Sequence, residues 1–133
     1  MSFDIELPNP FWFGIKIKES EDCLPSIGCE VELKLHMPGS IFSYSARDIW
    51  FECSVIDEFL SQLKNLKAGK TSIAEFYDLD REIVLSFTNE EIQFSVHRIH
   101  SETGSGYLEF KRGFDIDIVT QHIEYLESFA QWW

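Results

Sequence analysis

A two-sided helix near the middle of the chain places the strongest constraint on the fold. Between Phe51 and Gly69, apolar residues recur at helical spacing while polar residues fill the opposite side. Ser54 occupies an N-cap position, and Gly69 suits the left-handed conformation that often ends a helix. Because such a helix must bury its apolar side, the pattern predicts a helix over residues 54–68 packed on a sheet. Its apolar side contains Val55, Ile56, Phe59, Leu60, Leu63 and Leu66.

Alternating apolar and polar residues on both sides of this helix predict the strands of that sheet. Residues 41–51 are compatible with a strand pair or with one bent strand. Pro25 and Gly28 interrupt the alternation, so the acidic stretch from Glu19 to Gly28 is predicted to be a loop. The predicted strands cover residues 3–7, 11–18, 30–37, 41–51, 72–77, 82–87, 92–97 and 107–110.

A second amphipathic helix is predicted over about residues 116–131, with Asp115 or Asp117 as its N-cap. Its apolar residues follow the pattern of the first helix, which is compatible with a degenerate internal duplication or with convergence of two capped helices. With either origin, the element order predicts a single α+β domain over residues 1–133. We expect an antiparallel sheet or sandwich of about eight strands with two helices.

The charge of the chain limits its partners. Lys and Arg total 11 against 23 Asp and Glu, which gives a formal net charge of −12. Binding to nucleic acid or to anionic lipid is disfavoured, because both require cationic side chains. A cationic partner is favoured, since its encounter with such a surface is accelerated. The alternative is that the charge only keeps the domain soluble.

The cysteines and the start of the chain predict a reducing, cytoplasmic location. Cys23, Cys29 and Cys53 are odd in number and lack the paired spacing of a structural zinc site. The segment MSFDIELPNP has neither the basic region nor the apolar core of a signal peptide, and no apolar run is long enough to span a membrane. The adjacent Trp132 and Trp133 are expected either to dock onto the domain or to form an exposed patch, which leaves a dimer possible.

No catalytic motif is recognisable, so we expect no catalytic residue, metal or cofactor. His97 and His100 are three positions apart in or just after a strand, where they face opposite sides of the sheet. Asp78, Asp80 and Glu82 lack the further ligands and the central glycine of a calcium loop, and a solvated turn is the better interpretation.

The segment DIWFECSVIDEFLSQLKNLKAGKTSIAEFYDLDREIVLSF, followed by IQFSVHRI, YLEFKRGFDID and the closing helix, resembles immunity proteins of the WapI type. These small cytoplasmic proteins are encoded beside bacterial polymorphic toxins. The resemblance extends over residues 48–129, about two-thirds of the chain, and consists of apolar and turn residues. It implies a non-catalytic domain that binds and neutralises a cognate toxin, often a nuclease.

The resemblance and the charge agree on a basic partner, because a nuclease must attract phosphate and an acidic inhibitor can cover its substrate surface. An acidic adaptor or a small-ligand-binding domain is the alternative, for which a preformed apolar pocket would be diagnostic. An enzyme that uses carboxylates is the weakest alternative, because no convergent carboxylate pair is recognisable. The candidate contacts for a toxin are Glu19, Glu21, Asp22, Asp78, Asp80, Glu90 and Glu91.

Overall fold

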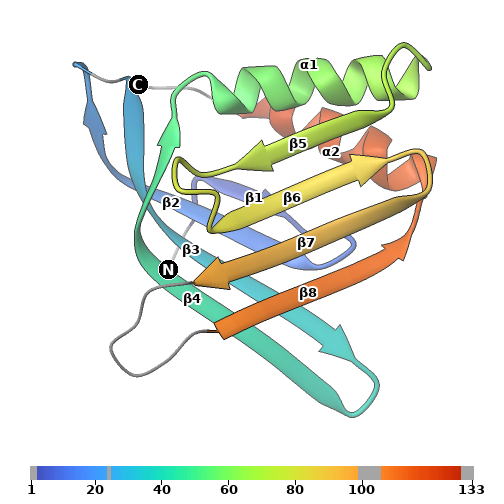
Figure 1. Ribbon diagram of the computed structural model, residues 1–133, viewed down its shortest axis with the longest axis horizontal. Coiled ribbons are helices and arrows are strands. Elements are labelled where there is room, and N and C mark those ends of the chain that lie inside the picture. The colour runs from blue at the N-terminus through green and yellow to red at the C-terminus, as the bar shows by residue number, and fades with distance from the viewer. Residues whose placement is uncertain (1–2, 24, 99–105, 130–133) are drawn as a thin grey trace.

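Over the residues that it describes, a computed structural model shows two four-stranded antiparallel sheets and two helices (Figure 1). The structure describes residues 3–23, 25–98 and 106–129. The prediction of an α+β fold with two amphipathic helices is confirmed. The first half contains β1 (Ile5–Leu7), β2 (Trp12–Glu21), β3 (Ser26–Met37), β4 (Ser40–Glu52) and α1 (Val55–Lys67). The second half contains β5 (Ile73–Tyr77), β6 (Ile83–Thr88), β7 (Glu91–Arg98), β8 (Gly106–Gly113) and α2 (Ile116–Ser128).

Each half is a meander in which neighbouring strands pair in chain order, β1-β2-β3-β4 in the first sheet and β5-β6-β7-β8 in the second. A helix follows each sheet, so the order of four strands and one helix occurs twice. This repetition is what an internal duplication would produce. The halves differ in size, since β2, β3 and β4 have 10, 12 and 13 residues whereas the strands of the second sheet have 5 to 8.

The core lies between the two sheets and is rich in phenylalanine. Phe13 of β2 lies 5.2 Å from Phe94 of β7 and 6.4 Å from Phe76 of β5, measured between ring centroids. Phe51 stacks on Phe76, and Phe59 of α1 contacts the rings of Phe76 and Phe87. Burying one such ring contributes roughly 2–3 kcal/mol, so these contacts hold the sheets and α1 together as one unit.

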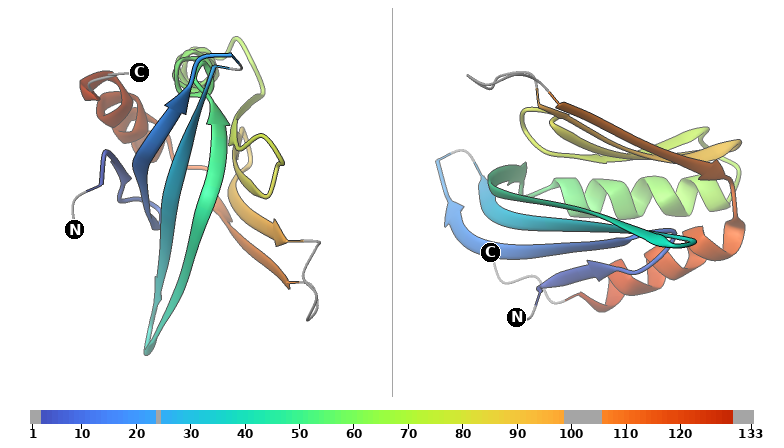
Figure 2. Two further views of the ribbon diagram at one scale, coloured as in Figure 1. Left: turned by 90° about the vertical axis from the view of Figure 1, so that its left-hand side faces the viewer. Right: turned by 90° about the horizontal axis from the view of Figure 1, so that it is seen from below.

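The two helices lie along the same side of the sandwich, with α1 packed on β5 and α2 beside α1 and β1 (Figure 2). Ser54 is the N-cap of α1 but makes no capping hydrogen bond with its side chain, whereas the Asp115 carboxylate accepts one from the Asp117 N–H at 2.9 Å. α2 ends at Ser128, before the predicted end, because the backbone of Phe129 is extended.

The acidic stretch that we predicted to be a loop is mostly strand, so that prediction is wrong. Glu19 pairs with Gly28 and Glu21 with Ser26, which leaves a tight connection between β2 and β3. The reason is tertiary. Trp50 of β4 lies over Gly28, and a Cβ atom at Gly28 would stand 2.8 Å from Cζ2 of that ring. Gly28 is therefore required by close packing inside the sheet and is not a loop residue.

The segment 41–51 belongs to one bent strand, the second of the two predicted alternatives. The β3–β4 pairing is regular from Met37 and Ser40 up to Val31 and Ala46, and a register shift follows before Cys29 pairs with Ile49. At the shift, Asp48 has a φ of 59°, an uncommon conformation for a residue with a side chain. The bulge bends β4 so that its last residues reach α1.

Candidate functional site

The structure separates the predicted contact residues into two groups. Glu19, Glu21 and Asp22 lie on the β2–β3 hairpin, and Asp78 and Asp80 lie on the β5–β6 turn, which is at the same end of the molecule. Glu90 and Glu91 lie at the β6–β7 turn, at the opposite end of β6. The Glu90 carbonyl there accepts a hydrogen bond from the Phe114 N–H at 3.0 Å, which places this turn beside the start of α2.

Backbone hydrogen bonds bring the first group together. The Cys53 N–H donates to the Pro25 carbonyl at 2.9 Å, and the Leu79 N–H donates to the Trp50 carbonyl at 2.8 Å. These bonds attach the β2–β3 hairpin and the β5–β6 turn to the junction between β4 and α1. Glu52 and Glu58, which the sequence did not single out, join the group through this junction. We call the surface formed by Glu21, Asp22, Glu52, Glu58 and Asp80 the acidic end.

An open depression of about 470 Å³ lies in the acidic end. Pro25, Cys53 and the half-exposed Leu79 give it an apolar floor, and Glu52 stands at its rim. A smaller adjoining hollow of about 60 Å³ shares Glu52 and Leu79 and adds Glu58. Among the described residues, no Lys or Arg lines either hollow. The arrangement can receive an apolar side chain that is flanked by cationic groups.

Arg81 is the cation nearest in sequence to this surface, and its side chain lies on Tyr77, which lines the smaller hollow. The guanidinium carbon lies 4.2 Å from the centroid of the Tyr77 ring, and Nη2 lies 3.4 Å from Glu75 Oε2. Both partners belong to β5. The charge of Arg81 is therefore directed to Glu75 and Tyr77 and does not pair with Glu52 or Glu58.

Asp78 has a structural position, which removes it from the candidate contacts. Its side chain is 2% exposed, and its carboxylate accepts a hydrogen bond from the Ile83 N–H at 2.8 Å. Burial raises the pKa of the Asp78 carboxyl above its ordinary value, and the bond from Ile83 partly opposes that shift. A buried carboxylate that closes the β5–β6 turn is not accessible to a partner.

The thiols of Cys53 and Cys29, at and near the acidic end, are not activated. Burial, with a smaller effect from the Asp22 charge, raises the pKa of Cys53 above its ordinary value. Burial raises the pKa of Cys29 to about 12. Because the thiolate is the nucleophilic form, both side chains are poor nucleophiles at neutral pH. Cys23, Cys29 and Cys53 are all free thiols.

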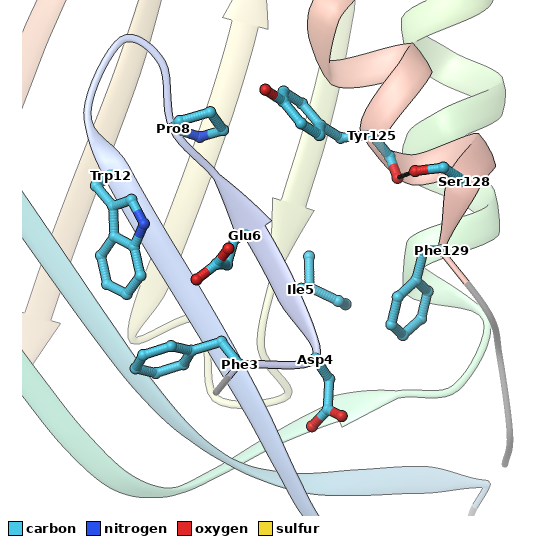
Figure 3. A pocket seen from close by; sticks show the side chains of 9 residues that line it. All are labelled: Phe3, Asp4, Ile5, Glu6, Pro8, Trp12, Tyr125, Ser128 and Phe129. Atoms are coloured by element: carbon cyan, nitrogen blue, oxygen red, sulfur yellow. Dashed lines mark hydrogen bonds between the residues drawn. The ribbon is translucent and has the colours of Figure 1, made fainter. Parts of the chain in front are cut away.

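A separate hollow of about 350 Å³, away from the acidic end, lies between β1 and the end of α2 (Figure 3). Its lining combines aromatic side chains, among them Trp12 and Tyr125, with the carboxylates of Asp4 and Glu6. The Asp4 carboxylate already accepts a hydrogen bond from the Ile17 N–H at 2.7 Å. This open, partly polar groove differs from the preformed apolar pocket that would be diagnostic of a small-ligand-binding domain.

Metal-binding clusters and membrane-spanning helices are not found in the part of the chain that the structure describes. No three His, Cys, Asp or Glu side chains there are placed to hold a metal ion. No helix within residues 3–23, 25–98 and 106–129 has the length and apolarity needed to cross a membrane.

His122 is fully buried in α2 against Phe87. His100, Trp132 and Trp133 lie outside the described residues.

Comparison with known proteins gave no match to a family model, to a curated protein or to a solved structure.

Proposed function

We propose that this protein is a non-catalytic immunity protein that binds and neutralises a cognate toxin, expected to be a cationic nuclease, through the acidic end. The observation that supports this proposal is the depression floored by Pro25, Cys53 and Leu79 and bordered by carboxylates. The resemblance of residues 48–129 to WapI-type immunity proteins supports it independently. Such a protein acts in the cytoplasm, where the toxin would otherwise reach its substrate.

Neutralisation by this surface needs no reaction. A field from 23 acidic side chains attracts a basic partner and accelerates the encounter, and the nearby charges of the acidic end orient it. Contacts with the apolar floor then slow the dissociation of the complex, because desolvated apolar anchors account for most binding energy in protein interfaces. Occupying the phosphate-binding groups of the nuclease excludes nucleic acid by direct competition.

We adjust the proposed set of contacts to the surface described above. Glu21, Asp22 and Asp80 stay as proposed contacts, and Glu52 and Glu58 are added to them. Glu19 is exposed on β2 close to this group and is proposed as a peripheral contact. Glu90 and Glu91, at the opposite end of β6, are outside the proposed interface and provide an internal control.

The test uses the protein encoded immediately beside this one. We expect it to be toxic when expressed alone and to be neutralised by co-expression. Replacing Glu58 by Lys should lower the association rate of the purified pair by about tenfold at low salt, and the difference should shrink as salt is added. Stopped-flow mixing measures the rate.

Glu90→Lys is the matched control, because it makes the same change in net charge at the other end of the molecule. Equal losses for Glu58→Lys and Glu90→Lys would show that only net charge matters, and the acidic end would not be the interface. If the protein encoded beside this one is neither toxic nor bound by it, the proposed immunity function is wrong.

A further inference from the structure

The β3–β4 hairpin projects beyond the rest of the sandwich (Figure 2, left). Three large apolar side chains near its tip are exposed: Met37 by 44%, Ile41 by 66% and Phe42 by 56%. Phe42 pairs with Leu35 and shares one face of the hairpin with Met37, whereas Ile41 pairs with His36 on the opposite face. Exposed apolar side chains on both faces of a projecting hairpin indicate an interaction surface.

The same hairpin offers an open strand edge. β4 is the last strand of its sheet, so one side of its backbone has no neighbouring strand within the described part of the chain. Residues 40–46, SIFSYSA, carry no charge and pair regularly with β3 up to the bulge. Open edges pair readily with another strand unless charges, bulges, short length or a covering element prevent it.

The other sheet edges have such protection. β1 has three residues and lies beside α2, and β5 is packed against α1. β8 carries Glu109, Lys111 and Arg112 along its length. The end of β4 beyond residue 46 is bent by its bulge, where Asp48 has its positive φ. Among the described residues, the unprotected edge is therefore the segment Ser40 to Ala46.

We propose that a second copy of this chain pairs with residues 40–46 in antiparallel orientation, around a twofold axis at Ser43. The two four-stranded sheets then become one eight-stranded sheet. In this register Phe42 lies opposite Tyr44 of the second copy, and Ile41 lies opposite Ser45. The segment is thus complementary to itself, with an aromatic cross-strand pair on each side of the axis.

The distribution of charge permits a second copy to approach at this place. Two chains that each carry a net charge of −12 repel one another over most of their surfaces. From Leu33 to Arg47, however, the sequence contains no Asp or Glu. The acidic end lies at the other end of β3, eight residues and roughly 26 Å along the strand from Lys34, which pairs with Ser43. The acidic ends of the two copies would therefore stand roughly 50 Å apart, several times the Debye length of about 10 Å at 0.1 M salt, so they barely oppose association.

The first test measures the mass of the purified protein by light scattering. The wild-type protein should have twice the 15.6 kDa mass of one chain, and Ile41→Lys should return it to one chain without altering the circular dichroism spectrum. Ile73→Lys is the matched control, because Ile73 is also exposed, by 42%, but lies on β5. A monomeric wild-type protein at its highest soluble concentration would overturn the proposal. Equal dissociation by both substitutions would overturn it as well.

The second test examines the register. In a background that carries Cys23→Ser and Cys53→Ser, Ser43→Cys should form a disulfide-linked dimer on mild oxidation. Ser45→Cys should not, because Ser45 of the two copies would stand roughly 13 Å apart along the strands, beyond the reach of a disulfide. Cross-linking through position 45 and not through position 43 would overturn the proposed pairing. Neither test involves the toxin, so its outcome is independent of the proposed function.

Discussion

At the scale of single residues, the buried ring of His122 has the clearest measurable consequence. Its Nδ1 lies 2.9 Å from the Ile118 carbonyl, and Nε2 has no hydrogen-bond partner among the described residues. Burial lowers the pKa of His122 from 6.5 to about 4. In the unfolded chain the ring binds a proton near pH 6.5, whereas the folded protein keeps it neutral, so stability falls as the pH falls between these values.

We therefore predict that about 3 kcal/mol of the free energy of unfolding is lost between pH 6.5 and pH 4 because of this one side chain. His122→Leu should remove that part of the pH dependence. Urea unfolding at several pH values measures the difference from wild type. Equal slopes for wild type and His122→Leu would show that the ring is protonated in the folded state.

The contact between Gly28 and Trp50 supplies a second prediction at this scale. A methyl group at position 28 would stand 2.8 Å from the Trp50 ring, so Gly28→Ala must displace the ring or the strand. The expected loss is about 1–3 kcal/mol, measured by chemical unfolding. Gly113→Ala is the control, because its Cβ would meet no atom within 4 Å. Combining Gly28→Ala with Trp50→Leu should restore part of the loss, and an undiminished loss would argue against this contact.

At the scale of elements, the β5–β6 turn depends on one buried carboxylate. Asp78 accepts from the Ile83 N–H, and its own carbonyl accepts from the Arg81 N–H at 3.0 Å. Asp78→Ala leaves the buried Ile83 N–H without that acceptor and should cost about 1–3 kcal/mol of stability. Asp80→Ala, two residues away and exposed, should leave stability unchanged while weakening toxin binding. Thermal unfolding separates the two effects, and similar unfolding curves for both variants would contradict the structural role of Asp78.

The helices and most strands could be predicted because their signal is local. Periodicity gave α1 with its bounds nearly correct, and alternation gave the second sheet strand by strand. The prediction for the β2–β3 hairpin was wrong because Pro25 and Gly28 resemble loop residues. The glycine is required instead by Trp50, which is distant in sequence. A single sequence shows the glycine but not the ring that covers it.

The candidate site was predictable only in part for a related reason. The acidic residues of the β2–β3 hairpin stood out as a run, but Glu52 and Glu58 are isolated in sequence and join them only through the β4–α1 junction. The burial of Asp78 was equally hidden, because its neighbours Asp80 and Glu82 suggest a solvated turn. The strand order of the two sheets and the gathering of acidic residues at one end of the molecule arise only in the assembled fold, so they could not be predicted from local sequence patterns.

At the scale of the whole molecule, the two proposed interfaces lie at opposite ends of β3 and make a joint prediction about stoichiometry. A dimer through residues 40–46 would present its two acidic ends far from the axis and from each other. Two basic toxin molecules should then bind without contact, which gives a complex of two copies of each protein. Because roughly 26 Å along β3 separates each acidic end from the axis, and so roughly 50 Å separates the two acidic ends, the first toxin should not change the affinity for the second.

Ile41→Lys provides the sharpest measurement of this independence. The variant should bind one toxin per chain with wild-type affinity, and light scattering should show a complex of one copy of each protein. Glu58→Lys should have the reverse effect: the protein should stay a dimer and bind the toxin more weakly. If Ile41→Lys abolished toxin binding, the hairpin would belong to the toxin interface. A substitution in a surface that only joins two copies, far from the acidic end, should not affect toxin binding.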